Sequence, residues 1–402
     1  MSSVISVVNL SRRSPLTVIF LTVFIDLLGF GIVIPLLPLY AQTFGASGAA
    51  VGLLVTVYSL AQFLSAPLWG RLSDRVGRRP VILAGLAGSA LAYLLLGLAQ
   101  SLEVLFAARI LAGITTGNLA AAQAYIADVT TPETRARGMG LFGAAFGLGF
   151  VFGPAIGGLL SRFGFGVPGF FAAGLSASSL CLALWLLPES RLAAATAAPR
   201  RRVWGQIWAA MGQARLAAPL AIFFAATFAF ANWETTFPLL GRARFRFSAA
   251  QIGYLFAYVG TLVALVQGVL VGRLVSRFGE RRLVILGTCL MLAGLVCVAL
   301  APNVWALAAA LALLACGSGV NTPSLSSLIS RAGGAGEQGG VLGISQALAS
   351  LARIVGPAWG GFTYDHFGIG SPYLTASGFL ALTFLLSLPV AGRAVAPRLS
   401  GR

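Results

Sequence analysis

Long apolar runs follow one another along nearly the whole chain, and short segments between them hold most of the charged residues. Each run has about 20 residues, which is the length of a helix that crosses the hydrocarbon core of a bilayer. Only helices and closed barrels satisfy their backbone groups in lipid, and a barrel would show short strands of alternating polarity. With 58% hydrophobic and 9% charged residues, the sequence predicts an all-α membrane protein, not a soluble enzyme.

The apolar runs predict twelve transmembrane helices in two sets of six. Residues 1–190 form the first six-helix bundle, 191–217 form a cytoplasmic linker with a short surface helix over 203–211, and 218–402 form the second bundle. The spans are expected at residues 15–40, 50–70, 80–99, 104–127, 138–160, 168–188, 218–240, 250–272, 282–301, 304–329, 340–363 and 372–391.

Two motifs repeat between the sets. The ten residues of Gly70–Arg79, read as a short hinge between spans 2 and 3, return 202 positions later at 272–281, with Ser276 in place of the aspartate. The pair Gly153-Pro154 returns as Gly356-Pro357 at an offset of 203. The chain is therefore a tandem repeat, which predicts two pseudo-symmetric bundles. The changed residue predicts a weaker second copy of the first motif.

The formal charge of +17 rests on 27 arginines and no lysine. If the N-terminus lies inside, the inner segments hold 21 of these arginines and the outer loops hold four. This bias predicts a multi-pass protein of the inner membrane with both termini in the cytoplasm. The positive charge is then a topology signal with anionic lipid as its partner, so we expect no nucleic acid.

The sequence predicts no metal site and no cofactor. The four cysteines lie inside apolar segments without CxxC spacing and are expected to be small core residues. There is one histidine, His366, and no phosphate-binding GxxxxGK[ST] loop. We therefore expect a protein that is neither an enzyme nor a pump driven by ATP.

Four ionisable residues fall within the predicted spans, where charge is costly and usually serves a pathway. Asp26 lies about 16 Å into span 1 at 1.5 Å per residue. It is expected to bind a proton or a cationic substrate, the alternative being a silent partner of a buried donor. Arg109 in span 4 could instead donate hydrogen bonds to carbonyl groups or to span 1. We expect both to act in proton coupling or substrate binding.

The other two ionisable residues lie in the second set of spans. Glu234 is nearer the outer end of span 7, and the alternative to a coupling role is neutralisation of Arg242 or Arg244. Arg353 in span 11 has no counterpart in the first repeat. It could pair with Glu234 or contact an anionic substrate group, and the sequence leaves both open.

At four places the chain resembles the major facilitator superfamily, specifically the twelve-span drug:proton antiporters that include the tetracycline exporters. Residues 70–79 fit the loop pattern GxLxDRxGRR, and Asp26–Pro38 fits the first-span pattern DxxGxGxxxPxLP. Arg109–Gly117 fits the arginine motif of span 4, and Gly149–Gly158 fits the antiporter motif of span 5. Four motifs in the right order make the resemblance specific, and it covers nearly the whole chain.

The resemblance implies roles for three groups of residues. Arg109 would influence protonation of a carboxylate. The cytoplasmic gate would consist of Gly70, Asp74, Arg75, Gly77, Arg78, Arg79 and Asp128. The antiporter motif, which would pack helices closely and allow a bend without touching ligand, would consist of Gly149, Gly153, Pro154, Gly157 and Gly158. The cavity would be lined by residues for which helix packing is an equal alternative, namely Gln62, Asn118, Gln123, Asn232, Trp233 and Asn321.

The implied function is export of amphipathic drugs or related small molecules in exchange for protons, by alternating access of a monomer. A symporter or facilitator for a small metabolite on the same fold is the alternative. One departure limits the substrate: tetracycline exporters carry an acid directly before Tyr93, where this chain has Ala92. The resemblance therefore leaves the substrate open among lipophilic compounds.

Overall fold

The computed structural model describes residues 15–116, 118–190, 214–332 and 338–393. All regular elements within these ranges are helices, as expected for an all-α membrane protein. The predicted linker helix at 203–211 lies outside the described residues.

The helices of the first set follow the predicted spans closely. They are α2 (Pro15–Val33), α3 (Leu37–Thr43), α4 (Gly48–Val76), α5 (Arg78–Gly97), α6 (Leu102–Thr115), α7 (Asn118–Asp128), α8 (Pro132–Leu160), a 3₁₀ turn η2 (Ser161–Phe163) and α9 (Gly166–Leu186). The second set consists of α11 (Ala214–Phe245), α12 (Ala249–Leu265), a π-helical turn η3 (Val266–Leu270), α13 (Val271–Phe278), α14 (Glu280–Leu300), α15 (Val304–Ala332), α16 (Gln338–Phe367) and α17 (Ser371–Arg393).

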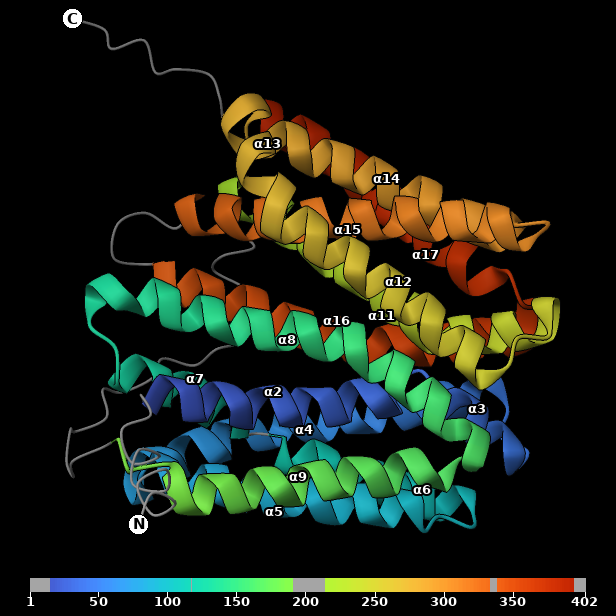
Figure 1. The fold of residues 1–402 in the computed structure, drawn as a ribbon. Helices are drawn as coiled ribbons and strands as arrows, with labels where there is room; N and C mark the ends of the chain where they lie inside the picture. Colours follow the sequence, from blue (N-terminus) through green and yellow to red (C-terminus); the bar gives the residue numbers. More distant parts are fainter. Residues whose placement is uncertain (1–14, 117, 191–213, 333–337, 394–402) are drawn as a thin grey trace, which may run out of the picture. The chain divides into compact units, whose positions relative to one another are not determined.

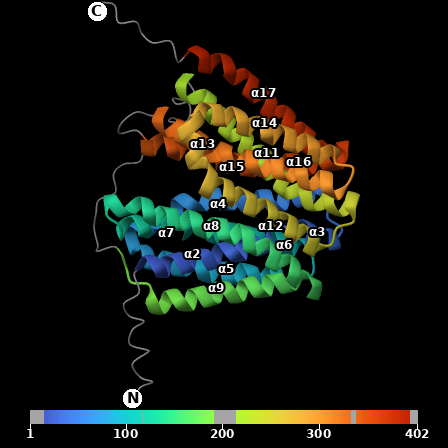
Figure 2. The same ribbon diagram turned by 45° about the horizontal axis from the view of Figure 1, so that its top comes forward.

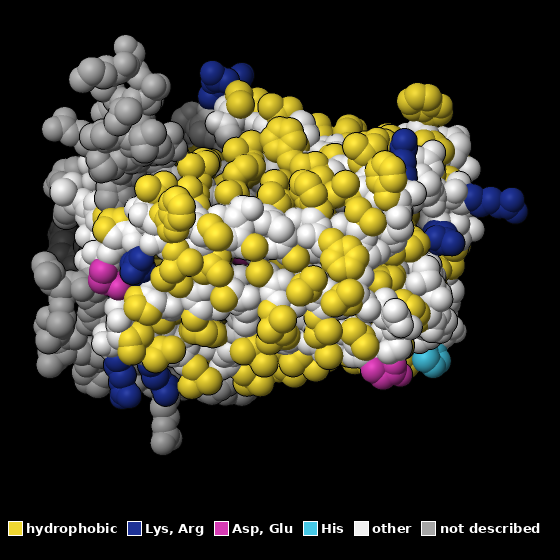
Figure 3. All heavy atoms as spheres, turned by 60° about the horizontal axis from the view of Figure 1, so that its bottom comes forward, with side chains coloured by type: hydrophobic (Ala, Val, Ile, Leu, Met, Phe, Trp, Pro, Cys, Tyr) yellow, Lys and Arg dark blue, Asp and Glu magenta, His cyan; other side chains and the backbone are white. Residues whose placement is uncertain are grey.

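The described chain contains eleven stretches of helix that are long and apolar enough to cross a membrane, and a shorter apolar helix at Ser371–Ser387. In the face drawn in Figure 3, hydrophobic side chains cover most of the surface and charged ones gather toward its ends. Exposed leucine and phenylalanine side chains, which would be costly in water, face lipid at no cost. The protein is therefore an integral, multi-pass membrane protein.

Three predicted spans are not single α-helices. Span 1 is divided into α2 and α3 at Ile34–Leu36, because Pro35 and Pro38 supply no backbone N–H. Span 4 is divided into two helices: α6 ends at Thr115 and α7 begins at Asn118. Span 8 contains the π-helical turn η3. Helix α15, the counterpart of span 4 in the second repeat, is continuous over 29 residues.

The expected hinge at residues 70–79 is much shorter than predicted. Helix α4 runs on to Val76 and α5 starts at Arg78, so Gly77 alone lies between them. Its φ of 102° lies in the region that only glycine adopts freely. Gly279 takes the same role between α13 and α14 with a φ of 76°. The glycines of the repeated motif thus make one-residue turns, and the arginines lie on helices.

The chain divides into two compact units. Unit 1 comprises Met1–Ala46, Val57–Ala197 and Phe247–Ala257, and unit 2 comprises Ser47–Thr56, Ala198–Arg246 and Tyr258–Arg402. The first residues of α4 therefore pack within unit 2, and the first residues of α12 pack within unit 1. The predicted domain boundaries at 190 and 218 stay a prediction.

Each unit has its own core. In unit 1, α2 packs along α8 and α9, and α5 packs along α9 (Figure 1). In unit 2, α14 lies beside α15, and α11 packs along α16 and α17 (Figure 2). Three cysteines are not core residues, contrary to expectation, because Cys181, Cys289 and Cys297 are exposed; Cys316 is half-buried and packs against a core cluster of unit 2. In a membrane-spanning helix a small apolar side chain can face lipid as easily as the interior.

Candidate functional site

Two opposite charges are buried together in unit 1. Asp26 on α2 is 6% exposed and Arg109 on α6 is 2% exposed. The guanidinium carbon of Arg109 lies 4.1 Å from the ring centroid of Tyr58 on α4. The buried hydroxyl of Tyr93 on α5 is within electrostatic range of Asp26, Tyr58 and Arg109. Four helices thus bring one acid, one base and two phenols into a single cluster, the buried charge cluster.

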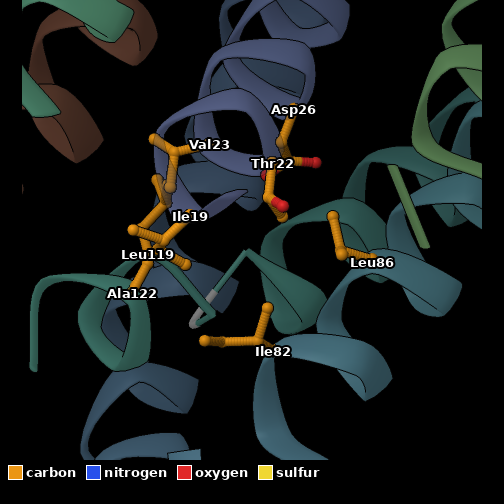
Figure 4. Close-up of a pocket in the computed structure, with 8 residues that line it drawn as sticks. All are labelled: Ile19, Thr22, Val23, Asp26, Ile82, Leu86, Leu119 and Ala122. Atoms are coloured by element: carbon orange, nitrogen blue, oxygen red, sulfur yellow. The ribbon is translucent and has the colours of Figure 1, made fainter. Parts of the chain in front are cut away.

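Asp26 also borders a small pocket. The pocket has a volume of about 10 Å³, room for roughly one water molecule. Asp26 and Thr22 provide its oxygen atoms, as Figure 4 shows, and the other walls are apolar. The lining residues come from α2, α5 and α7: Ile19, Thr22, Val23, Asp26, Ile82, Leu86, Leu119 and Ala122. A pocket of this size suits a proton carrier such as water and is too small for a drug.

The two candidate coupling residues of unit 2, Glu234 and Arg353, have different surroundings. Glu234 on α11 is partly buried, whereas Arg353 on α16 is exposed. Arg353 lies about 22 Å from the start of its helix at 1.5 Å per residue, near the middle of that span. An arginine exposed at this depth is costly against lipid, so its surroundings are expected to be aqueous.

The six candidate cavity residues are not alike. Asn232, Trp233 and Asn321 are buried among helices, where the amide of Asn232 donates to the carbonyl of Pro372 at 3.2 Å and that of Asn321 donates to Thr288 at 3.3 Å. These contacts agree with the packing alternative. Gln62 is partly exposed and Gln123 is exposed. The side chain of Asn118 lies outside the described residues.

A second group of charges joins three helices of unit 1 at the α4–α5 turn. Arg78 contacts Asp74 of α4 through Nη1 at 2.8 Å and Asp128 of α7 through Nε at 3.0 Å. Its Nη1 also donates to the hydroxyl of Ser73 at 3.0 Å. Asp74 therefore pairs with Arg78. Ser73, Asp74, Arg78 and Asp128, together with Glu189, are here called the first-half charge cluster.

Glu189, which the sequence reading did not single out, completes this cluster. Its carboxylate accepts hydrogen bonds from the backbone N–H of Arg78 at 2.9 Å and of Arg79 at 3.2 Å. A carboxylate at this position accepts hydrogen bonds from two of the free N–H groups at the start of α5. Its negative charge also interacts favourably with the positive end of the helix dipole. The start of α5 has no acid of its own. The segment after α9 therefore closes the α4–α5 turn.

Three glycines of the predicted antiporter motif lie against a neighbouring helix. A Cβ on Gly149, Gly153 or Gly157 of α8 would lie within 3 Å of the backbone of α2. Gly31 of α2 is equally tight, since its Cβ would be 2.4 Å from the carbonyl oxygen of Gly149. Close backbone approach of this kind needs small residues on both helices. The motif thereby positions the helix that carries Asp26.

At each of the repeated Gly-Pro pairs, a glycine of another helix lies directly against the backbone of the proline. In unit 1, a Cβ on Gly253 of α12 would lie 2.3 Å from the carbonyl oxygen of Pro154. In unit 2, a Cβ on Gly52 of α4 would lie 2.3 Å from that of Pro357. The two halves therefore use the repeated motif for the same contact.

Asp365 on α16 is a further residue that sequence reading missed. Its carboxylate oxygens accept from the backbone N–H of Gly48 at 2.8 Å and of Ala49 at 2.7 Å. These are the first residues of α4, so Asp365 caps that helix from 316 positions away. No local signal marks such a cap, because the acid and the helix start meet only in the fold.

The chain has many membrane-spanning helices, and it buries an acid and an arginine at the depth of these spans. Such buried charges are typical of membrane transporters. The Major Facilitator Superfamily model matches residues 19–271 and 222–400. The chain belongs to this superfamily, and it is a transporter and not an enzyme.

Known proteins similar to this chain include efflux proteins. Tetracycline resistance protein, class C, from Escherichia coli is 38% identical over 87% of this chain and 89% of its own length. Multidrug resistance protein 2 of Bacillus subtilis (strain 168) is 29% identical over 94% and 95%. The crystal structure of the human organic anion transporter MFSD10 (TETRAN) is 29% identical with a TM-score of 0.70, covering 94% of this chain and all of that one.

Proposed function

We propose that this protein exports amphipathic drugs or related small molecules from the cytoplasm in exchange for protons, by alternating access. The observation that carries the proposal is the buried charge cluster, which holds Asp26, Arg109 and Tyr93 inside the membrane-spanning helices of one unit. A buried carboxyl group that can take up either a proton or a cationic ligand is the minimum equipment for exchange.

The surroundings of Asp26 fit this role. Asp26 is buried among membrane-spanning helices, where an ionised carboxylate is costly unless a proton or a positive charge accompanies it. The adjoining pocket has room for about one water molecule, which could carry the proton. The buried charge cluster therefore supplies both the group that titrates and a place from which a proton reaches it.

The first-half charge cluster supports a gate on the cytoplasmic side. Arg78 joins the end of α4, the start of α5 and the end of α7 through Asp74 and Asp128. We place this cluster, both termini and the linker inside the cell on the distribution of arginine, with anionic lipid as the partner of the exposed arginines. We expect a monomer in the inner membrane.

Two relatives are named a tetracycline resistance protein and a multidrug resistance protein, which supports drugs as the substrate class. Ala92 stands where tetracycline exporters carry an acid before Tyr93, so a broader range of drugs is proposed in place of a metal–tetracycline complex. The membrane potential would add about 2.3 kcal/mol per charge per 100 mV to a cycle that moves net charge.

Organic anions are a second candidate class, because Arg353 is exposed in the middle of its span. An arginine in an aqueous surrounding can hold a carboxylate or sulfonate. The human structure at 29% identity is called an organic anion transporter. Uptake of a metabolite by a symporter or facilitator remains the alternative direction.

Collapse of a pH gradient in inverted membrane vesicles tests the proposal. The panel would contain lipophilic cations, tetracycline, neutral drugs and organic anions. We expect at least one compound to release the gradient with the wild-type protein and not with Asp26→Asn. Glu103→Gln is the matched control, because Glu103 is an exposed acid at the start of α6.

The control should release the gradient as the wild type does. Proton exchange through Asp26 is wrong if Asp26→Asn behaves like Glu103→Gln with every active compound. Downhill flux of a metabolite without any proton movement would replace the antiporter by the facilitator.

A further inference from the structure

The second repeat contains a charge contact that mirrors the first-half charge cluster with the signs exchanged. Glu280 of α14 accepts from Arg331 Nη2 of α15 at 3.0 Å and from the hydroxyl of Ser327 at 2.6 Å, both at Oε1. Glu280, Ser327 and Arg331 are here called the second-half charge cluster. Each unit thus has an ion pair where two spans meet beside a one-residue glycine turn.

The two ion pairs occupy equivalent places in the repeat. Glu280 lies 202 positions after Arg78, and Arg331 lies 203 positions after Asp128. These are the offsets of the repeated loop motif and of the Gly-Pro motif. The base of the first half is therefore replaced by an acid, and the acid by a base. The replacement of the motif aspartate by Ser276 predicts a weaker contact, whereas the structure has kept a contact of reversed polarity.

Polarity matters because helix ends carry partial charge. Glu280 is the first residue of α14 and Arg331 lies in the last turn of α15, so each charge is opposite to its helix end. In the first half, Arg78 begins α5 and Asp128 ends α7, so each charge has the same sign as its helix end. The first contact opposes both dipoles and depends on Glu189 to satisfy the start of α5. The second contact agrees with both dipoles.

The helices that carry the second-half charge cluster are also closely packed. Gly287 and Gly294 of α14 and Gly317 of α15 bring the two backbones so close that a Cβ on any of them would lie within 3 Å of the other helix. Asn321 of α15 also donates to Thr288 of α14. Helix α15 is unbroken, whereas Asp128 lies on the separate helix α7 of 11 residues.

We propose that Glu280 and Arg331 form a permanent clamp that keeps α14 and α15 together as one rigid body, while the dipole-opposed Arg78–Asp128 contact of the first half opens and closes. Glu280 and Arg331 act as positioning residues: they touch neither substrate nor proton, and they fix the inner end of span 10 to span 9. The opening of the first-half cluster rests on the proposed alternating-access cycle, whereas the clamp does not.

Hydrogen–deuterium exchange of the purified full-length protein tests the clamp directly. Glu280→Gln keeps an acceptor for Ser327 and removes only the charge. We expect exchange at the start of α14 and in the last turn of α15 to rise roughly threefold to tenfold. Arg281→Gln, which removes an exposed charge from the same turn of α14, is the matched control and should leave exchange unchanged.

Three further variants separate the ion pair from mere packing. Arg331→Gln should match Glu280→Gln, the double variant should be no worse than either single one, and Arg331→Lys should keep most of the protection. Additive effects of the two single changes, or exchange in Arg331→Lys as fast as in Arg331→Gln, would overturn the ion-pair clamp.

Comparison with Asp26→Asn distinguishes the clamp from the cycle. We expect this variant to change exchange at the start of α5 and the end of α7 while the second-half cluster keeps its protection. Equal exchange at α5 and α7 in both proteins would contradict the cycle and leave the clamp intact. A matching change at the second-half cluster would show that the clamp is not permanent.

Discussion

Substitution of Gly153 by alanine tests whether the antiporter motif is a packing surface. A Cβ at this position would lie 2.6 Å from the carbonyl carbon of Gly31 and 2.7 Å from its Cα. Ordinary contacts of this kind need at least 3.4 Å, so α2 or α8 must move by several tenths of an ångström or more. Overpacking of a tight interface costs about 1–3 kcal/mol.

Gly147→Ala on the same helix is the matched control, because no atom lies within 4 Å of the new Cβ. Both variants gain the same preference of alanine for helix, about 0.5–1 kcal/mol over glycine. The difference between them therefore isolates the packing cost. We expect Gly153→Ala to be about 1–3 kcal/mol less stable than Gly147→Ala.

Unfolding of the two purified variants in mixed micelles with increasing dodecyl sulfate gives this difference. Transport should also fall in Gly153→Ala, since α2 carries Asp26 five residues before Gly31. The account of the motif as a packing surface is refuted if both variants unfold at the same detergent composition and Gly153→Ala still transports poorly. That result would assign Gly153 to the ligand path.

Two other predictions concern the carboxylates that cap helices from a distance. Glu189→Gln weakens the acceptor for the N–H groups of Arg78 and Arg79, so we expect a loss of about 1 kcal/mol in stability and faster amide exchange at the start of α5; unchanged exchange would contradict the cap. Asp365→Ala removes the cap of α4 at Gly48 and should cost about 0.5–2 kcal/mol in the same unfolding assay. A variant as stable as the wild type would show that water replaces the carboxylate.

Sequence reasoning succeeded where the signal is local or repeated. Apolar runs locate the helices because lipid requires them, and the repeat offset places equivalent residues together. Asp74 and Arg78 are only four residues apart in the loop motif, so their contact across the Gly77 turn is a local one that the motif already suggests. The buried position of Asp26 follows from its depth in an apolar run.

The misses depend on contacts between distant segments or on details of helix ends. Glu189 and Asp365 cap helices that begin 111 and 317 positions away, and no pattern near either acid marks them. The α4–α5 turn was expected to be a hinge of ten residues, yet one glycine suffices once the arginines are helical. The cysteines were expected inside by the burial rule for water, which does not hold for a side chain that can face lipid.

Proton release on ligand binding is the measurement that tests proton exchange most directly. The purified protein in weakly buffered detergent solution receives a compound that collapses the pH gradient, and the released protons are measured. The account predicts release by the wild type and by Glu103→Gln, with the release lost in Asp26→Asn. Equal release by Asp26→Asn and wild type would contradict the claim that substrate and proton compete for Asp26.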